Sequence, residues 1–227
     1  MKRFVSYTGG ALTALSGLLA ALLFILLTLA NIPGFYMLAM ERAGVPSSAG
    51  VSQHDLSLAI IDIVEYLRGA DVTFDREIIM DGEPRPEFGA RERDHMKDVR
   101  ALFSLALRVA FVSLAMCIIC AFISRIGRNP RAADWGALSG TLLWVAVAIT
   151  IFIISQSNFL NIFTEFHKIL FTNDLWQLDP RTDLLIRMMP TPFFIMFAAA
   201  IGGAWAIIIA AVLATCIIQL GRNRYIK

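Results

Sequence analysis

Hydrophobic residues along the chain occur in four long blocks that contain no charged residue, at 4–40, 109–124, 135–164 and 188–221. A helix needs roughly 20 apolar residues to cross about 30 Å of hydrocarbon, and each block approaches or exceeds that length. The second block reaches it if the helix enters near Ala101 and Arg108 extends its side chain to the interface. The pattern therefore predicts four membrane spans, at about 11–35, 101–124, 136–158 and 193–219.

The segment between the first two spans, at about 36–100, is long enough to form a small cap. Ser52 and Asp55 have the spacing of a helix-capping box, and Gly69 is a typical helix stop. Between them apolar residues recur at helical intervals: Leu56, Ala59, Ile60, Ile63, Val64 and Leu67. This predicts an amphipathic helix. After it, the sequence indicates a short strand at 72–80, a turn at Asp81-Gly82 and an extended link with Pro84 and Pro86.

Charge decides the orientation of the spans. The two ends and the 125–135 loop carry eight basic residues and one acid, Asp134. The positive-inside rule therefore places residues 1–10, 125–135 and 220–227 in the cytoplasm, and 36–100 and 159–192 on the outer face. The first apolar run is too long for a cleaved signal core and is expected to remain as an anchor. The predicted fold class is an all-α membrane protein, a bundle of four transmembrane helices with a small extracytoplasmic cap.

Several kinds of chemistry lack their usual sequence signals. The remaining acids and bases are interleaved, which leaves no basic stripe for nucleic acid. The three cysteines, at 117, 120 and 216, all fall within spans, where the Cys-Ile-Ile-Cys sequence is better explained by packing than by redox activity. We find no phosphate loop, dinucleotide fingerprint, serine elbow or HExxH zinc motif. No Asp, Glu, Lys or His lies deep in a span, as a proton-coupled transporter would require. Neither a metal nor a cofactor is expected.

His95 is the first of two candidate catalytic residues. No helix breaker occurs between about Arg91 and Gly127, so the second spanning helix is expected to begin outside the membrane, with His95 one to two turns above the lipid. Asp98 follows at i+3 and could orient the imidazole. The alternative is a solvated surface histidine in a charged stretch, and spacing alone favours that alternative.

His167 is the second candidate and lies in the short, aromatic second outer segment. Phe163, Phe166 and Phe171 share a face with it if the third span continues as a helix. A histidine among phenylalanines is more often a core residue whose nitrogens bond to the backbone. Trp176 fits an interfacial anchor equally well. Because spans two and three are joined by a short loop, the outer ends that carry the two histidines are expected to meet.

Three stretches of the chain resemble the bacterial lipoprotein intramolecular transacylases. They are Arg-Glu-Arg-Asp-His-Met-Lys-Asp-Val-Arg at 91–100, Phe-His-Lys-Ile-Leu-Phe-Thr-Asn-Asp-Leu-Trp at 166–176, and Asp-Leu-Leu-Ile-Arg-Met-Met-Pro at 183–190. Four spans with a long first and a short second outer segment also match that family. The resemblance implies a bacterial membrane acyltransferase that moves the sn-2 acyl chain of a diacylglyceryl-lipoprotein to the α-amino group of its own amino-terminal cysteine.

The resemblance also implies the roles of individual residues. By motif, His95 and His167 are the catalytic pair. Glu92, Asp98, Asn173 and Asp174 belong to the same motifs and are expected to support the pair. Phe163, Phe166, Phe171 and Trp176 are expected to line the substrate pocket and exclude water. The implied partners are a diacylated lipoprotein and membrane lipid.

The residue types suit this reaction independently of the resemblance. An α-amino group titrates near 8 and histidine near 6.5, so a histidine is a suitable base for the attacking amine. Because amine and ester belong to one molecule, holding them together supplies much of the catalysis. Two alternatives stay open: a non-catalytic membrane sensor or assembly factor, in which the histidines would be dispensable, and an intermolecular phospholipid acyltransferase or lipase.

Overall fold

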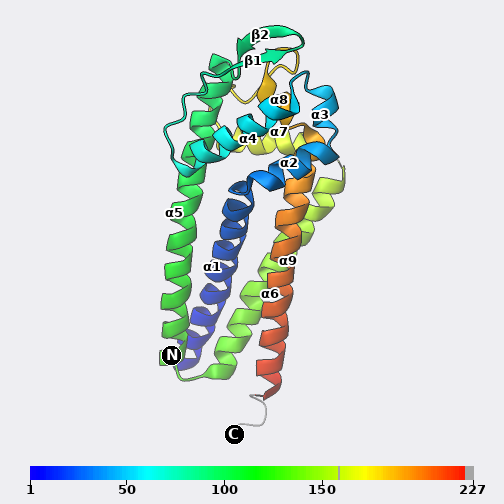
Figure 1. Ribbon diagram of the computed structural model, residues 1–227. Coiled ribbons are helices and arrows are strands. Elements are labelled where there is room, and N and C mark those ends of the chain that lie inside the picture. The colour runs from blue at the N-terminus through cyan, green and yellow to red at the C-terminus, as the bar shows by residue number, and fades with distance from the viewer. Residues whose placement is uncertain (158, 223–227) are drawn as a thin grey trace. The chain divides into compact units, whose positions relative to one another are not determined.

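The computed structural model describes residues 1–157 and 159–222, which fold into nine helices and one two-stranded sheet (Figure 1). The helices are α1 (Lys2–Ala30), α2 (Pro33–Arg42), α3 (Val45–Ser48), α4 (Gln53–Arg68), α5 (Ala90–Ile126), α6 (Pro130–Ser157), α7 (Phe159–Leu170), α8 (Leu184–Met188) and α9 (Thr191–Arg222). The strands are β1 (Glu77–Met80) and β2 (Glu83–Pro86). The described residues form two compact units: residues 1–26, 106–157 and 201–222, and residues 27–105 and 159–200. We call them the helical unit and the cap unit.

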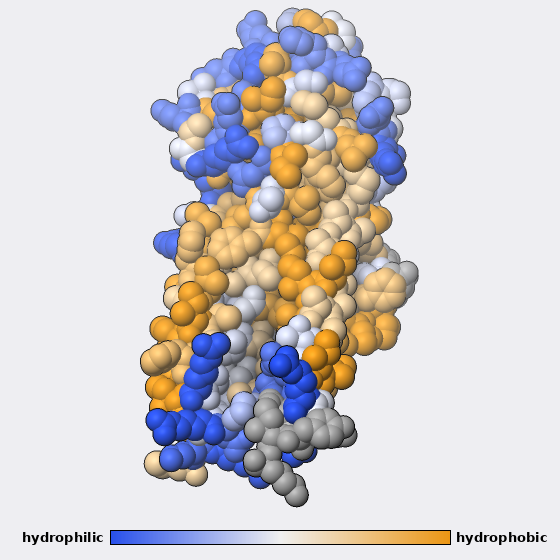
Figure 2. Space-filling view, turned by 60° about the horizontal axis from the view of Figure 1, so that its bottom comes forward, coloured by the Kyte–Doolittle hydropathy of each residue, from blue (hydrophilic) through white to orange (hydrophobic). Residues whose placement is uncertain are grey.

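Four helices, α1, α5, α6 and α9, are long and apolar enough to cross a membrane, which confirms the predicted fold class. Their side chains in the helical unit are largely apolar and exposed, as those of Ile118, Phe122 and Ile207 illustrate. Figure 2 shows this hydrophobic surface over the long helices, and hydrophilic residues both over the cap unit and at the end of the helical unit. A helix surface that is apolar on its outside is suited to lipid rather than to water.

The helical unit is held together by close packing around α1. Trp144 of α6 and Trp205 of α9 each donate an indole hydrogen bond to an α1 carbonyl, those of Leu15 (3.0 Å) and Leu18 (2.9 Å). The two indole rings also meet edge to face, with centroids 5.2 Å apart. In hydrocarbon a buried indole N–H must find a partner within the protein, so these bonds fix α6 and α9 against α1.

The cap unit contains the predicted amphipathic helix, α4. Its first turn is capped by Ser52, whose hydroxyl accepts a hydrogen bond from the Asp55 N–H (3.0 Å), and Gly69 ends it in the left-handed conformation (φ 106°). The apolar face of α4 supplies Leu56, Ile60 and Ile63 to the core of the unit, and all three side chains are buried. The sequence pattern therefore predicted both the bounds and the buried face of this helix.

The strand region differs from the prediction. The strand is shorter than the expected 72–80, because Phe74 adopts a positive φ (57°) that extended pairing does not permit and β1 begins only at Glu77. Residues 83–86, expected to be an extended link, are extended and also pair as β2 antiparallel to β1 across the Asp81-Gly82 turn. In a two-stranded sheet both strands are edges, so the missing N–H groups of the prolines can face outward.

Candidate active site

The cap unit brings His95 and His167 together. His95 lies in the second turn of α5, before the apolar part of that helix begins, and His167 lies near the end of α7. Their ring centroids are 6.4 Å apart and the rings are tilted by 34°. This separation is too wide for a direct hydrogen bond between the rings. Both side chains are buried, with only 8% and 9% of their surface exposed.

An aromatic wall surrounds the two imidazoles. Phe171 contacts both rings, with centroids 5.2 Å from His95 and 5.6 Å from His167. Phe163, one turn before His167, lies 4.1 Å from that ring, and Trp176 lies 5.0 Å from it. Phe166 also contacts the imidazole edge at 5.6 Å, but 53% of its surface is exposed, so it borders the site from outside. Such a wall lowers the local dielectric and strengthens electrostatic interactions within the site.

The hydrogen bonds of His167 determine which nitrogen can act as a base. Its Nδ1 lies 2.6 Å from the Phe163 carbonyl oxygen. A carbonyl can only accept, so in the neutral ring Nδ1 carries the proton and Nε2 keeps its lone pair. Burial lowers the pKa of His167 below its usual value, and the hydrogen bond to Phe163 partly offsets this. The neutral, proton-accepting form therefore prevails at neutral pH.

His95 has a different environment. Its Nδ1 is buried and has no hydrogen-bond partner within the described part of the chain. The pKa of His95 is lowered to about 4, mainly by burial and to a smaller extent by the nearby His167, while Asp98 acts in the opposite direction. A buried polar atom without a partner is uncommon in proteins and is often found at functional sites. His95 is thus a neutral imidazole with a ring nitrogen available to a ligand.

Asp98 does not orient His95 by a hydrogen bond, contrary to the spacing argument. Its carboxylate accepts a hydrogen bond from the Asn173 side-chain amide (2.8 Å). The Asn173 carbonyl in turn accepts the Trp176 indole N–H (3.1 Å). Through Asn173, Asp98 is therefore connected to the segment that carries Trp176, a residue of the aromatic wall. Spacing along one helix could not reveal this, because Asn173 comes from another part of the chain.

Two further contacts connect α5 with the segment after α7. Glu92 is fully buried, and its two carboxylate oxygens accept the backbone N–H groups of Gly89 (2.6 Å) and Leu185 (2.7 Å). Arg91 forms a hydrogen bond to the Asp174 carbonyl oxygen and an ion pair with the Asp174 carboxylate (3.4 Å). The four supporting residues expected from the motifs thus all take part in contacts between α5 and the part of the chain that follows α7.

The sequence argument missed two residues of the site. Arg91 was quoted within the first motif but given no role, although it holds the segment that carries Asp174. Phe194, near the start of α9, packs against Phe163 with ring centroids 4.7 Å apart and extends the aromatic wall. Its position just after Pro192 was the available signal. Over residues 1–157 and 159–222 no cluster of three or more His, Cys, Asp or Glu side chains could hold a metal ion.

Both a protein-family model and solved structures match this chain. The family model for the lipoprotein intramolecular transacylase Lit matches residues 11–194. The chain belongs to the lipoprotein intramolecular transacylase family. The resemblance inferred from the three motifs is therefore confirmed, and with it the class of enzyme, a membrane acyltransferase. No observation supports the sensor alternative.

Solved structures show the same fold. The membrane-integral lipoprotein intramolecular transacylase Lit from Bacillus cereus aligns with a TM-score of 0.70 at 20% identity, covering 99% of this chain and 95% of that one. A variant of it with histidine replaced by arginine aligns with a TM-score of 0.72 at 18% identity, covering 100% and 95%. A histidine-to-alanine variant aligns at 0.62 and 22%, covering 95% and 91%. No curated protein sequence matches the chain.

Proposed function

We propose that this enzyme transfers the sn-2 acyl chain of a diacylglyceryl-lipoprotein to the α-amino group of the same amino-terminal cysteine, with His95 and His167 as its catalytic residues. The observation that carries the proposal is the buried histidine pair inside an aromatic wall, in a chain of the transacylase family. The products would be an amide on the cysteine and a free sn-2 hydroxyl, a lyso-form lipoprotein. No water or second substrate takes part.

His167 serves as the base because its Nε2 lone pair is free. The cysteine amine attacks the ester carbonyl carbon while Nε2 accepts a proton from the amine nitrogen. The tetrahedral intermediate then collapses: the bond between the carbonyl carbon and the glyceryl oxygen breaks, and the His167 imidazolium returns the proton to that oxygen. One histidine thus acts first as base and then as acid, and the number of protons balances over the cycle.

His95 serves as the donor to the ester carbonyl oxygen, on which negative charge develops. Its low pKa keeps the ring neutral, and a neutral imidazole has one N–H to donate. A donor fixed in a dry site stabilises an oxyanion more than it would in water, because no solvent must reorganise. With ring centroids 6.4 Å apart, the donor and the base are close enough to act on one ester group.

The location of the site follows from chain connectivity and charge. Only residue 158 separates the end of α6 from the start of α7, so α7 begins where the third span ends. The outer face of α7 exposes Leu160, Phe166 and Ile169, the last with 81% of its surface, as an interfacial helix would. We place this site at the outer boundary of the bacterial cytoplasmic membrane, with both termini in the cytoplasm and lipid acyl chains meeting the exposed side of α7. Nucleic acid is not a partner in this proposal.

The orientation predicts which residues an impermeant thiol reagent reaches in intact cells. Single cysteines are introduced at the exposed positions Glu83 and Arg131, in a background with the three native cysteines replaced. We expect the reagent to label one of them in intact cells and not the other. Glu83→Cys is expected to be labelled and Arg131→Cys to be labelled only after the membrane is permeabilised, because the basic loop faces the cytoplasm. Labelling of Arg131→Cys in intact cells would reverse the orientation.

The proposed reaction moves an acyl chain within one lipoprotein, so the mass of that lipoprotein should not change. In a bacterial host whose lipoproteins are diacylated, expression of this enzyme should leave the mass of an amino-terminal lipopeptide unchanged. One acyl chain should move from glycerol to the cysteine nitrogen, which tandem mass spectrometry detects in the fragments. Loss of one fatty acid from the total mass would indicate a lipase instead, and an unaltered lipopeptide in spite of membrane-inserted enzyme would refute the proposal.

The pH profile should reveal a base with a lowered pKa. Below the amine pKa, near 8, kcat/KM should fall tenfold per pH unit as the substrate amine is protonated. When His167 also becomes protonated the decline should steepen to a hundredfold per unit. Because burial lowers the pKa of His167, this second break should lie below pH 6.5. Initial rates on a diacylated lipopeptide in detergent, between pH 5 and 9, test the expectation, and a second break at or above pH 6.5 would contradict it.

A further inference from the structure

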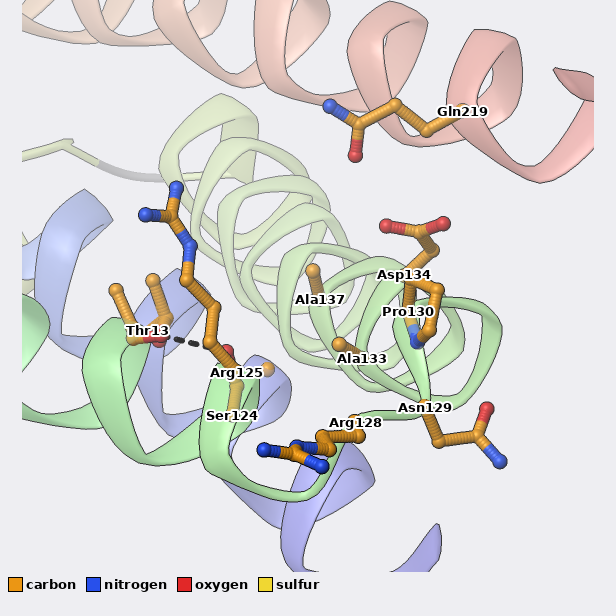
Figure 3. A pocket seen from close by; sticks show the side chains of 12 residues that line it. Thr13, Ser124, Arg125, Arg128, Asn129, Pro130, Ala133, Asp134, Ala137 and Gln219 are labelled. Atoms are coloured by element: carbon orange, nitrogen blue, oxygen red, sulfur yellow. Dashed lines mark hydrogen bonds between the residues drawn. The ribbon is translucent and has the colours of Figure 1, made fainter. Parts of the chain in front are cut away.

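A cavity of about 370 Å³ lies in the helical unit, where α5 ends and α6 begins (Figure 3). It belongs to neither the histidine pair nor the aromatic wall. Residues of all four long helices and of the loop that joins α5 to α6 line it. Its polar lining includes Arg125, Arg128, Asp134 and Gln219, and small or apolar residues such as Ala121 and Ala137 complete it. Figure 3 shows the Gln219 amide extending from α9 toward the side where Arg125 and Asp134 lie.

The loop that carries Arg128 is fixed by hydrogen bonds to α1. The Ser6 hydroxyl donates to the Ser124 carbonyl (2.9 Å) and accepts the Asn129 N–H (3.3 Å). The Asn129 side chain then accepts the Ala132 N–H (3.0 Å) in the first turn of α6. Arg128 itself has a φ of 52°, a conformation that residues with a side chain rarely adopt. The backbone therefore holds this arginine at the cavity in a fixed position.

The two arginines lack a protein partner. Neither guanidinium of Arg125 or Arg128 has a hydrogen bond or an ion pair with any residue in 1–157 or 159–222. Together they give the cavity more positive than negative charge, since Asp134 is the one acid in its lining. A guanidinium presents paired N–H donors whose geometry matches two oxygens of a phosphate group. A phosphate monoanion would therefore suit the net charge of this cavity and could accept hydrogen bonds from either guanidinium.

We propose that this cavity binds the phosphodiester headgroup of a membrane phospholipid. A lipid is favoured over a soluble anion because the lining also has an apolar part, formed by Gly10, Ala121, Ala133 and Ala137. The adjoining outer surfaces of α5 and α9 are apolar too, as exposed Phe122 and Ile218 show, and acyl chains can lie along them. Basic pockets between helices at a membrane surface commonly hold such headgroups. The inference does not depend on the proposed reaction.

Native mass spectrometry of the purified full-length protein in detergent tests the proposal with phosphatidylglycerol and phosphatidylethanolamine as probes. The variant Arg125→Gln/Arg128→Gln should lose at least tenfold in retention of both lipids, because it removes the charge-assisted hydrogen bonds to the phosphate. The matched control Arg131→Gln/Arg222→Gln removes the same charge from exposed positions outside the cavity lining and should retain both lipids. Arg125→Lys/Arg128→Lys should recover part of the binding.

Equal lipid retention by the double variant and its control would overturn the proposal. If the double variant does not fold, Arg128→Gln alone, at an exposed side chain, should still lower retention severalfold, and an unchanged value would count against the site. Millimolar inorganic phosphate and glycerol 3-phosphate are added as competitors in a separate arm. Displacement of the lipid by either would identify a site for soluble phosphate and so overturn the assignment to phospholipid.

Discussion

Replacing His167 by alanine should lower turnover of a diacylated lipopeptide by about 10³–10⁴-fold in a protein that still folds and inserts. The change removes the proposed base, whose Nε2 lone pair is available because Nδ1 donates to the Phe163 carbonyl. General acid–base catalysis contributes about 10²–10⁴-fold. His95→Ala should cost about 10²–10³-fold, as expected for a lost oxyanion donor. The double replacement should be little worse than His167→Ala, because both residues serve one step.

The matched control for these variants is His54→Ala. His54 is an exposed residue of α4 in the same unit and belongs to none of the three motifs, so its replacement should leave turnover unchanged. His95→Gln retains a side-chain N–H donor and should recover part of the activity that His95→Ala loses. Purified proteins are compared by thermal unfolding and by initial rates. Near-normal turnover in well-folded His167→Ala would refute the mechanism.

Replacing Gly136 by alanine should lower the free energy of unfolding of the helical unit by about 3 kcal/mol. Its melting temperature should fall by about 5–10 °C. A Cβ at this α6 position would lie 1.9 Å from the Tyr7 carbonyl oxygen of α1, so backbone and not a flexible side chain must move. Gly10 shows the reciprocal contact, because its Cβ would lie 2.1 Å from the Ala133 carbonyl oxygen. Small residues at such positions let two membrane helices approach closely.

Gly202 offers a control of the same chemical change. It lies in α9, and a Cβ there would meet no atom within 4 Å. Gly202→Ala should therefore leave the melting temperature unchanged or raise it, since alanine favours a helix by about 1 kcal/mol over glycine. Thermal unfolding in one detergent, followed by tryptophan fluorescence, compares the two variants with the native protein. A Gly136→Ala protein that melts at the native temperature would show that α1 and α6 can separate at no cost.

The sequence by itself determined the elements of this protein whose signals are local. Charge-free blocks of spanning length are sufficient to locate four helices, because hydrocarbon admits few other structures. The apolar period and the capping pattern located α4, and the absence of a breaker placed His95 on the same continuous helix as the second span. Three short motifs identified the family, which the matching family model confirmed over most of the chain.

Only the tertiary structure decided which groups meet. No local pattern could show that Asp98 bonds to Asn173 instead of orienting His95, or that Glu92 bonds to the Leu185 N–H. The predicted strand and the Asp81-Gly82 turn are present, but the start of β1 at Glu77 and the pairing of 83–86 with it were not predicted, because they depend on the backbone conformation of Phe74 and on a partner strand. The tautomer of His167 follows from a single carbonyl, and the low pKa of His95 follows from burial by elements distant in sequence. The periodicity of a sequence predicts which face of one segment is buried and which is exposed. The chemistry of a site depends on which side chains and backbone groups of several segments come into contact when the chain folds.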